Sequence, residues 1–94
     1  MATYFMFGKY SVEAIKGMSA DRTAKAGKLI QKYRGKLNSI HALTGDRDLV
    51  IIATFPSTEA AMKASIAITR LTGIAFATSE AIEVKDFDRL VSEI

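Results

Sequence analysis

The residues best suited to chemistry lie in a short turn near the middle of the chain and in the segment just before it. Arg47 and Asp48 are adjacent in the turn Gly45–Asp48, and His41 precedes that turn. An arginine can bind a carboxylate or phosphate through two parallel hydrogen bonds, and an aspartate can accept a hydrogen bond from a ligand amine. Histidine changes its charge near neutral pH, so acid/base chemistry there would use His41 first. We therefore predict that His41, Arg47 and Asp48 bind a ligand.

The same residues also have a structural interpretation, which the pattern favours for most of them. Gly45 fits a turn that needs a positive φ, and Asp46 and Asp48 are suited to bonding nearby backbone amides. A single histidine in a strand is more often a hydrogen-bonded structural residue than a catalytic one. We therefore assign no catalytic residue, and an enzymatic activity is not favoured.

Tyr4 is the fourth candidate for ligand binding. It belongs to an aromatic and methionine cluster that is more often a core than a binding site. If two subunits form a cavity between them, however, part of the cluster could line that cavity and contact the ligand. The cluster comprises Tyr4, Phe5, Met6, Phe7 and Phe76.

Several classes of site are disfavoured. The chain has no cysteine and one histidine, which makes a zinc site improbable. It contains neither H-E-x-x-H nor G-x-S-x-G, and neither a Walker loop nor a dinucleotide fingerprint. We therefore expect no metal and no cofactor. The lack of cysteine is compatible with a reducing compartment, and without a basic signal region or a long apolar run we expect a cytoplasmic protein away from membranes.

Charge is distributed unevenly along the chain. Residues 9–36 carry eight bases and two acids, whereas residues 37–94 carry five bases and eight acids. The aromatic residues are not interleaved with the bases, so a stacking surface for nucleic acid is lacking, and we expect a solvated helix face instead. We call Lys25, Lys28 and Lys32 the basic stripe; Lys36 follows it.

Hydrophobic periodicity predicts the order of the elements. Residues 49–53 form an unbroken apolar run, which favours a central strand covered on both faces. Ser11 and Ser57 are suited to capping helices, and Gly35 and Gly73 to ending them. The apolar residues Phe87, Leu90, Val91 and Ile94 predict a short amphipathic helix at the end. The expected strands are residues 3–10, 36–43, 48–55 and 74–84, with main helices over residues 20–34 and 57–72.

This order is that of a ferredoxin-like βαββαβ sandwich, an α+β fold with two helices on one face of an antiparallel sheet. We predict a single domain over residues 1–94 with a short C-terminal helix. The second face of the sheet has no helix in this arrangement, although the central strand is apolar on both sides. We therefore predict a homodimer, or a higher homo-oligomer, whose sheets form a dimeric α+β barrel.

The chain resembles the GYD-domain family of small ferredoxin-like proteins, for which no activity is established. The resemblance runs nearly from end to end and includes Tyr4, Arg22-Thr23, Gly35-Lys36, Ala42-Leu43-Thr44-Gly45, Asp48-Leu49-Val50, Phe55-Pro56, Ala61–Ser65, Thr72-Gly73-Ile74 and Phe87-Asp88. Gly45 and Asp48 match the Gly-x-Tyr-Asp turn for which the family is named. Arg47 stands where that turn has tyrosine, and His41 occupies a position that is often aromatic.

The segment Thr44–Val50 is also similar to the effector-binding domains of leucine-responsive and asparagine-responsive transcription regulators, which sense small molecules at subunit interfaces. Together these resemblances imply a small oligomeric protein of unassigned function. We predict that it binds a small anionic or amphipathic ligand in the dimer barrel or serves as an interaction module. The alternative is a cofactor-independent enzyme, similar to monooxygenases of this fold, that acts in the barrel cavity.

Overall fold

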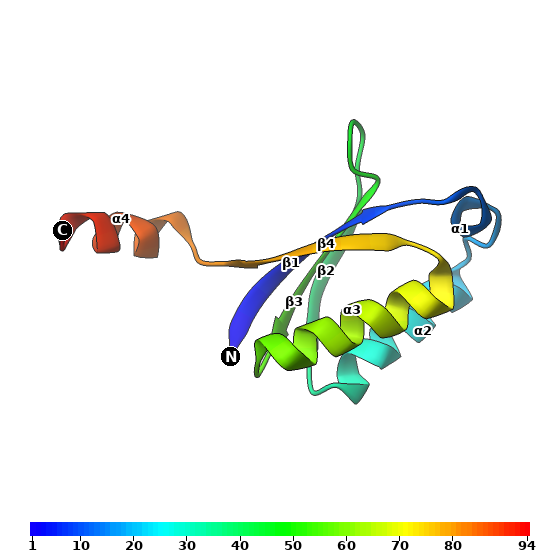
Figure 1. Ribbon diagram of the computed structural model, residues 1–94, viewed down its shortest axis with the longest axis horizontal. Helices are drawn as coiled ribbons and strands as arrows, with labels where there is room; N and C mark the ends of the chain where they lie inside the picture. Colours follow the sequence, from blue (N-terminus) through cyan, green and yellow to red (C-terminus); the bar gives the residue numbers. More distant parts are fainter.

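Strands and helices follow one another in the predicted order along all 94 residues of the computed structural model. The four strands form one antiparallel sheet in the order β2-β3-β1-β4, and α2 and α3 lie together on one of its faces (Figure 1). This confirms the ferredoxin-like α+β fold. The elements are β1 (Ala2–Lys9), α1 (Val12–Lys16), α2 (Ala20–Lys32), β2 (Lys36–Ala42), β3 (Leu49–Phe55), α3 (Thr58–Thr72), β4 (Ala75–Ala81) and α4 (Val84–Ser92).

The core lies between the sheet and the two long helices. β3 pairs with β2 on one side and with β1 on the other, so its apolar run is central in the sheet, as predicted. Side chains of one parity on β1 and β3 point toward the helices and are buried there, among them Tyr4, Met6, Ile51, Ala53 and Phe55. The other parity points to the face of the sheet without helices, which we call the open face. Only 15 of the 94 residues are buried, so much of the apolar surface is exposed in a single copy.

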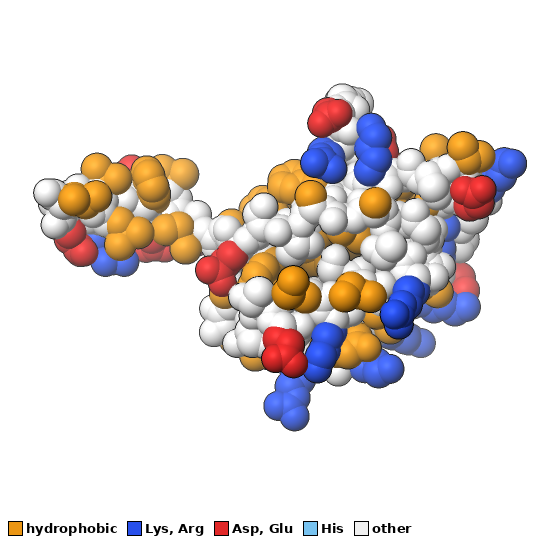
Figure 2. Space-filling model, in the orientation of Figure 1, with side chains coloured by type: hydrophobic (Ala, Val, Ile, Leu, Met, Phe, Trp, Pro, Cys, Tyr) orange, Lys and Arg blue, Asp and Glu red, His pale blue; other side chains and the backbone are white.

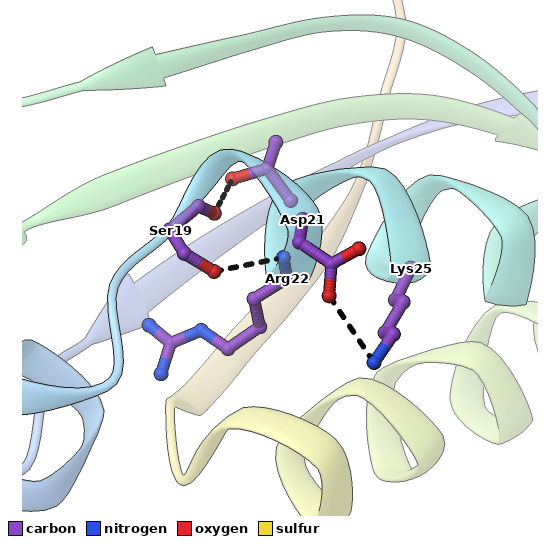
Figure 3. A network of polar contacts seen from close by, with 5 residues as sticks. Ser19, Asp21, Arg22 and Lys25 are labelled. Atoms are coloured by element: carbon purple, nitrogen blue, oxygen red, sulfur yellow. Dashed lines mark hydrogen bonds and ion pairs between the residues drawn. The ribbon is translucent and has the colours of Figure 1, made fainter.

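Serine side chains start three of the helices. Ser11, Ser19 and Ser57 each accept a hydrogen bond from the backbone N–H three residues later, which satisfies one of the free donors at a helix start. Figure 3 shows this at α2, where Ser19 Oγ accepts from Arg22 N at 3.1 Å and Lys25 pairs with Asp21 at 3.2 Å. The basic stripe is thus partly neutralised by its own helix.

The end of α2 differs in detail from the prediction that Gly35 stops the helix. The left-handed residue is Arg34, with φ 65°, and Gly35 comes one position later. Arg34 N donates to Gln31 O and Gly35 N donates to Ile30 O, the two hydrogen bonds of a Schellman motif. Gly35 is needed for space, because a Cβ there would lie 2.4 Å from Cε1 of Phe55. Gly73, by contrast, ends α3 with φ 77°, as predicted.

The fourth strand is shorter than the predicted span of residues 74–84. It spans Ala75–Ala81, and its last residue pairs with Thr3 of β1. Val84 already belongs to α4, which projects beyond the sheet in the view of Figure 1. The radius of gyration is 14.2 Å, larger than the roughly 12 Å expected for a compact chain of this length. The projecting helix accounts for the excess.

Candidate functional site

The turn between β2 and β3 is tied to the end of β1. Asp48 N donates to Gly8 O at 2.9 Å, and Asp48 Oδ2 accepts from Tyr10 N at 2.9 Å. Lys9 Nζ donates to Asp46 O at 2.8 Å. Gly45 has φ 93°, the positive value expected for this turn. The turn is therefore a fixed platform, and one carboxylate oxygen of Asp48 is already used by the backbone.

Arg47 and His41 are both exposed and lie near this platform. Arg47 is in the turn itself and makes no hydrogen bond or ion pair within the chain, so its guanidinium is available to an anion. His41 pairs with Val50 in the sheet, and paired residues point to the same face. His41 therefore belongs to the open face, at its β2 edge.

Tyr4 lies on the opposite face of the sheet from His41. Its ring is 3% exposed and packs edge-on against Phe55, with ring centroids 5.8 Å apart. The hydroxyl donates to Glu80 Oε1 at 3.1 Å and lies 3.2 Å from Thr58 Oγ1. Because the tyrosine has one proton, donation to Glu80 leaves Thr58 as the donor to Tyr4. The four predicted ligand-binding residues are therefore not brought together, since Tyr4 faces the helices.

A cleft of about 400 Å³ lies between α3 and β4, with this hydrogen-bonded group at one end. We call it the α3–β4 groove. Its apolar lining comes from Ala61, Met62 and Ile66 of α3 and from Phe76 of β4. Figure 2 views this side of the molecule, and hydrophobic side chains are visible over α3. The groove combines an apolar wall with hydroxyl and carboxylate groups.

Two rows of residues cross the open face, and both are apolar at their centre. One row crosses the sheet from β2 to β4 as His41, Val50, Phe7 and Ala77, and the next as Ser39, Ile52, Phe5 and Ser79. The rings of Phe5 and Phe7 are 6.2 Å apart and both are half-buried. No helix covers these rows. The surface is therefore apolar at its centre and polar on β2, a pattern suited to an amphipathic molecule or another apolar face.

A second cleft, of about 610 Å³, opens at the end of this face near the start of α4. Thr3, Phe5 and Asn38 line it together with Ile52 and Ala81. Thr54 Oγ1 donates to Asn38 Oδ1 at 3.3 Å beside the irregular register of β2. The cleft thus continues the apolar centre of the open face toward the C-terminal helix.

Sequence reasoning missed the partners of Tyr4. Glu80 and Thr78 alternate with Ser79 on β4, and their parity places them on the face with the helices rather than on the open face. Polar residues at strand positions that point toward the helices can be recognised in the sequence, and they indicate a cleft rather than a packed core. Thr58 could not be found this way, because it lies at the start of a helix far along the chain.

No three histidine, aspartate or glutamate side chains are grouped so that they could hold a metal ion. None of the helices combines the length and apolar character that spanning a membrane requires.

Comparisons with known proteins agree with the fold. A search of solved structures matched the crystal structure of the leucine response regulatory protein LrpA of Mycobacterium tuberculosis, with a TM-score of 0.58 and 10% sequence identity. The match covers 87% of this chain and 51% of that chain, so the chain spans about half the length of the regulator. A sequence search among curated proteins found no significant match. The model of the GYD domain matches residues 4–91, which include most of β1, the other three strands, α2 and α3, and the Gly45–Asp48 turn. This chain is therefore a member of the GYD-domain family.

Proposed function

We propose that the protein forms a homodimer through the open face of its sheet and binds a small amphipathic anion inside the resulting barrel. The single observation that supports this is the open face itself. Phe5, Phe7 and Ile52 are apolar, partly exposed and uncovered by any helix, although they lie at the centre of the sheet. Stacking two such faces would remove this apolar surface from water.

The polar groups around this surface support the anionic part of the proposal. His41 ends one apolar row on β2, and Arg47 is an exposed, unpaired cation in the turn that follows this strand. A ligand with an apolar body and one carboxylate would place the body over Phe5 and Phe7 and the carboxylate toward these groups. Asp48 would position the turn through the backbone of Tyr10, with its second carboxylate oxygen left for a ligand amine.

Sedimentation at micromolar concentration tests the pairing. We expect the wild type to sediment as a dimer or larger assembly of the 10.2 kDa chain, and Phe5→Lys to sediment as a smaller assembly, since a charge would be desolvated in the interface. Ile15→Lys is the matched control, because Ile15 is 59% exposed on α1, outside the sheet. Circular dichroism checks that both variants fold. A wild-type monomer would refute the pairing.

A thermal-shift titration with straight-chain carboxylates tests the ligand. We expect a rise in melting temperature with decanoate, a smaller rise with acetate, and a reduced response in Arg47→Ala, whose own melting temperature should match the wild type. Arg70→Ala is the control, since Arg70 is an exposed arginine on α3. Equal responses from Arg47→Ala and Arg70→Ala would show that Arg47 does not bind the anion.

A further inference from the structure

The C-terminal helix α4 has an apolar stripe that nothing in its own chain covers. None of its residues is buried, and Val84, Phe87 and Val91 are 72%, 56% and 51% exposed. A helix of 9 residues is too short to be stable by itself in water, since isolated helices shorter than about 12–15 residues are marginal. The helix therefore needs another surface on which to pack its apolar stripe.

The route of the chain directs α4 away from its own body. Only Ile82 and Glu83 separate β4 from α4, and Glu83 is extended, with φ −68° and ψ 149°. The helix consequently continues beyond the end of β4 rather than turning back over the sheet or the helices (Figure 1). Packing α4 over the α3–β4 groove of its own chain would require the chain to turn back within these two residues. A second copy of the chain meets no such restriction.

We propose that α4 of one copy docks in the α3–β4 groove of a second copy, and that the exchange is reciprocal. The dimensions agree: the groove is lined along α3 from Thr58 to Ile66, about 12 Å at 1.5 Å per residue, and the 9 residues of α4 extend about 13 Å. Ala61 and Ser65 are small, which allows a helix to approach closely. Met62 and Ile66 are 60% and 54% exposed and would pack against the apolar stripe.

Charge on the two surfaces supports this choice of site. At 100° per residue, Asp86 borders the stripe of α4 beside Leu90 and Asp88 borders it beside Val84. Lys85 and Arg89 lie on the opposite side of the helix, where Arg89 pairs with Glu93 at 3.2 Å. On α3, Lys63 and Arg70 are three and four residues from Ile66 and therefore lie beside it. One acidic border of α4 would thus meet the basic rim on α3, although Lys63 is already paired with Glu59 at 3.2 Å and Glu80 lines the groove on β4.

The exchange would use a different face of the sheet from the proposed barrel. A docked α4 would form a third helix in the layer of α2 and α3 and would cover Phe76 at the exposed side of β4. The exchanged helix uses the helical side of the sheet, whereas the proposed barrel uses the other side. The inference is therefore independent of the proposed function.

Cross-linking in trans tests the exchange, because the natural chain has no cysteine. Ile66→Cys and Val91→Cys chains, distinguished by tags of different mass, are mixed and treated with a short bismaleimide. We expect a linked heterodimer from this pair. The matched control replaces Ile66→Cys with Ile15→Cys, which is 59% exposed but lies on α1, and should give at least tenfold less heterodimer.

Two further reactions make every outcome decisive. Val91→Cys chains that also carry Phe87→Asp should lose the cross-link to Ile66→Cys, because the stripe is interrupted. Adding Phe5→Lys to both partners should preserve the cross-link, which separates the exchange from open-face pairing. Equal yields from the Ile66 and Ile15 pairs would overturn the proposal. So would a linked monomer formed at nanomolar concentration by the double variant Ile66→Cys/Val91→Cys, since α4 would then be packing on its own chain.

Discussion

Replacing Gly35 with alanine is expected to destabilise the fold strongly, although the residue stands just after a helix end. The new Cβ would lie 2.4 Å from Cε1 and 2.7 Å from Cδ1 of Phe55, and 2.8 Å from Cγ2 of Ile30. Phe55 and Ile30 are both 0% exposed, so neither side chain can move into solvent. Overpacking of this kind costs about 1–3 kcal/mol. At about 4–8 °C per kcal/mol for a domain of this size, the melting temperature should fall by about 4–24 °C.

The neighbouring residue is the control, and the opposite result is expected there. Arg34 has φ 65°, which costs an L-residue about 1–2 kcal/mol. Arg34→Gly removes that strain but makes the unfolded chain more flexible, which costs about 0.4–1 kcal/mol, so a net gain of up to about 1.6 kcal/mol remains. If Gly35 were instead the residue that needs a left-handed conformation, Arg34→Gly would give no gain.

Urea and thermal unfolding of both variants, at one protein concentration because of possible self-association, measure these effects. A Phe55→Leu background provides a further check, since a smaller side chain at the point of contact should reduce the cost of Gly35→Ala. The reasoning would be refuted if Gly35→Ala had the same urea midpoint as the wild type. It would also be refuted if Gly35→Ala lowered the free energy of unfolding by the same amount in the Phe55→Leu background.

Three other predictions concern the site and the surface. Gly45→Ala should cost on the order of 1 kcal/mol through backbone strain alone, because φ is 93° and no atom lies within 4 Å of the added Cβ; an unchanged urea midpoint would contradict this. Tyr4→Phe should lower the free energy of unfolding, measured by chemical denaturation, by about 1 kcal/mol, because it removes the hydroxyl that bonds to Glu80 and Thr58. Tyr10→Phe is the control and should change this free energy very little, because the hydroxyl of Tyr10 makes no hydrogen bond in the chain. Replacing all three lysines of the basic stripe with glutamine should change the free energy of unfolding by less than about 0.5 kcal/mol per site. The sedimentation coefficient should stay the same. If the variant lost a nucleic-acid partner in a pull-down, the interpretation of the stripe as a solvated face would be refuted.

Local patterns in the sequence were sufficient to predict the order of the elements. Ser57 after Pro56 marks the start of a helix and Gly73 marks its end because caps act through the nearest backbone groups. The uninterrupted apolar run beginning at Leu49 likewise identified the central strand, since only a strand with neighbours on both sides can bury both of its faces. The family resemblance depended on the same local features, and the GYD-domain match over residues 4–91 agrees with it.

Alternation along a strand places Tyr4 and Phe5 on opposite faces of the sheet, but it does not determine which of these two residues points toward the helices. That choice depended on how α2 and α3 pack over the sheet, and it placed Tyr4 in the α3–β4 groove rather than with His41 on the open face. The partner Glu80 is 76 residues away in the chain, and no local pattern relates two residues at that separation. The assignment at the end of α2 required tertiary information for a similar reason. The sequence predicts that a glycine ends the helix there, but only the position of the Phe55 ring shows that Gly35 is needed for space while Arg34 adopts the left-handed conformation.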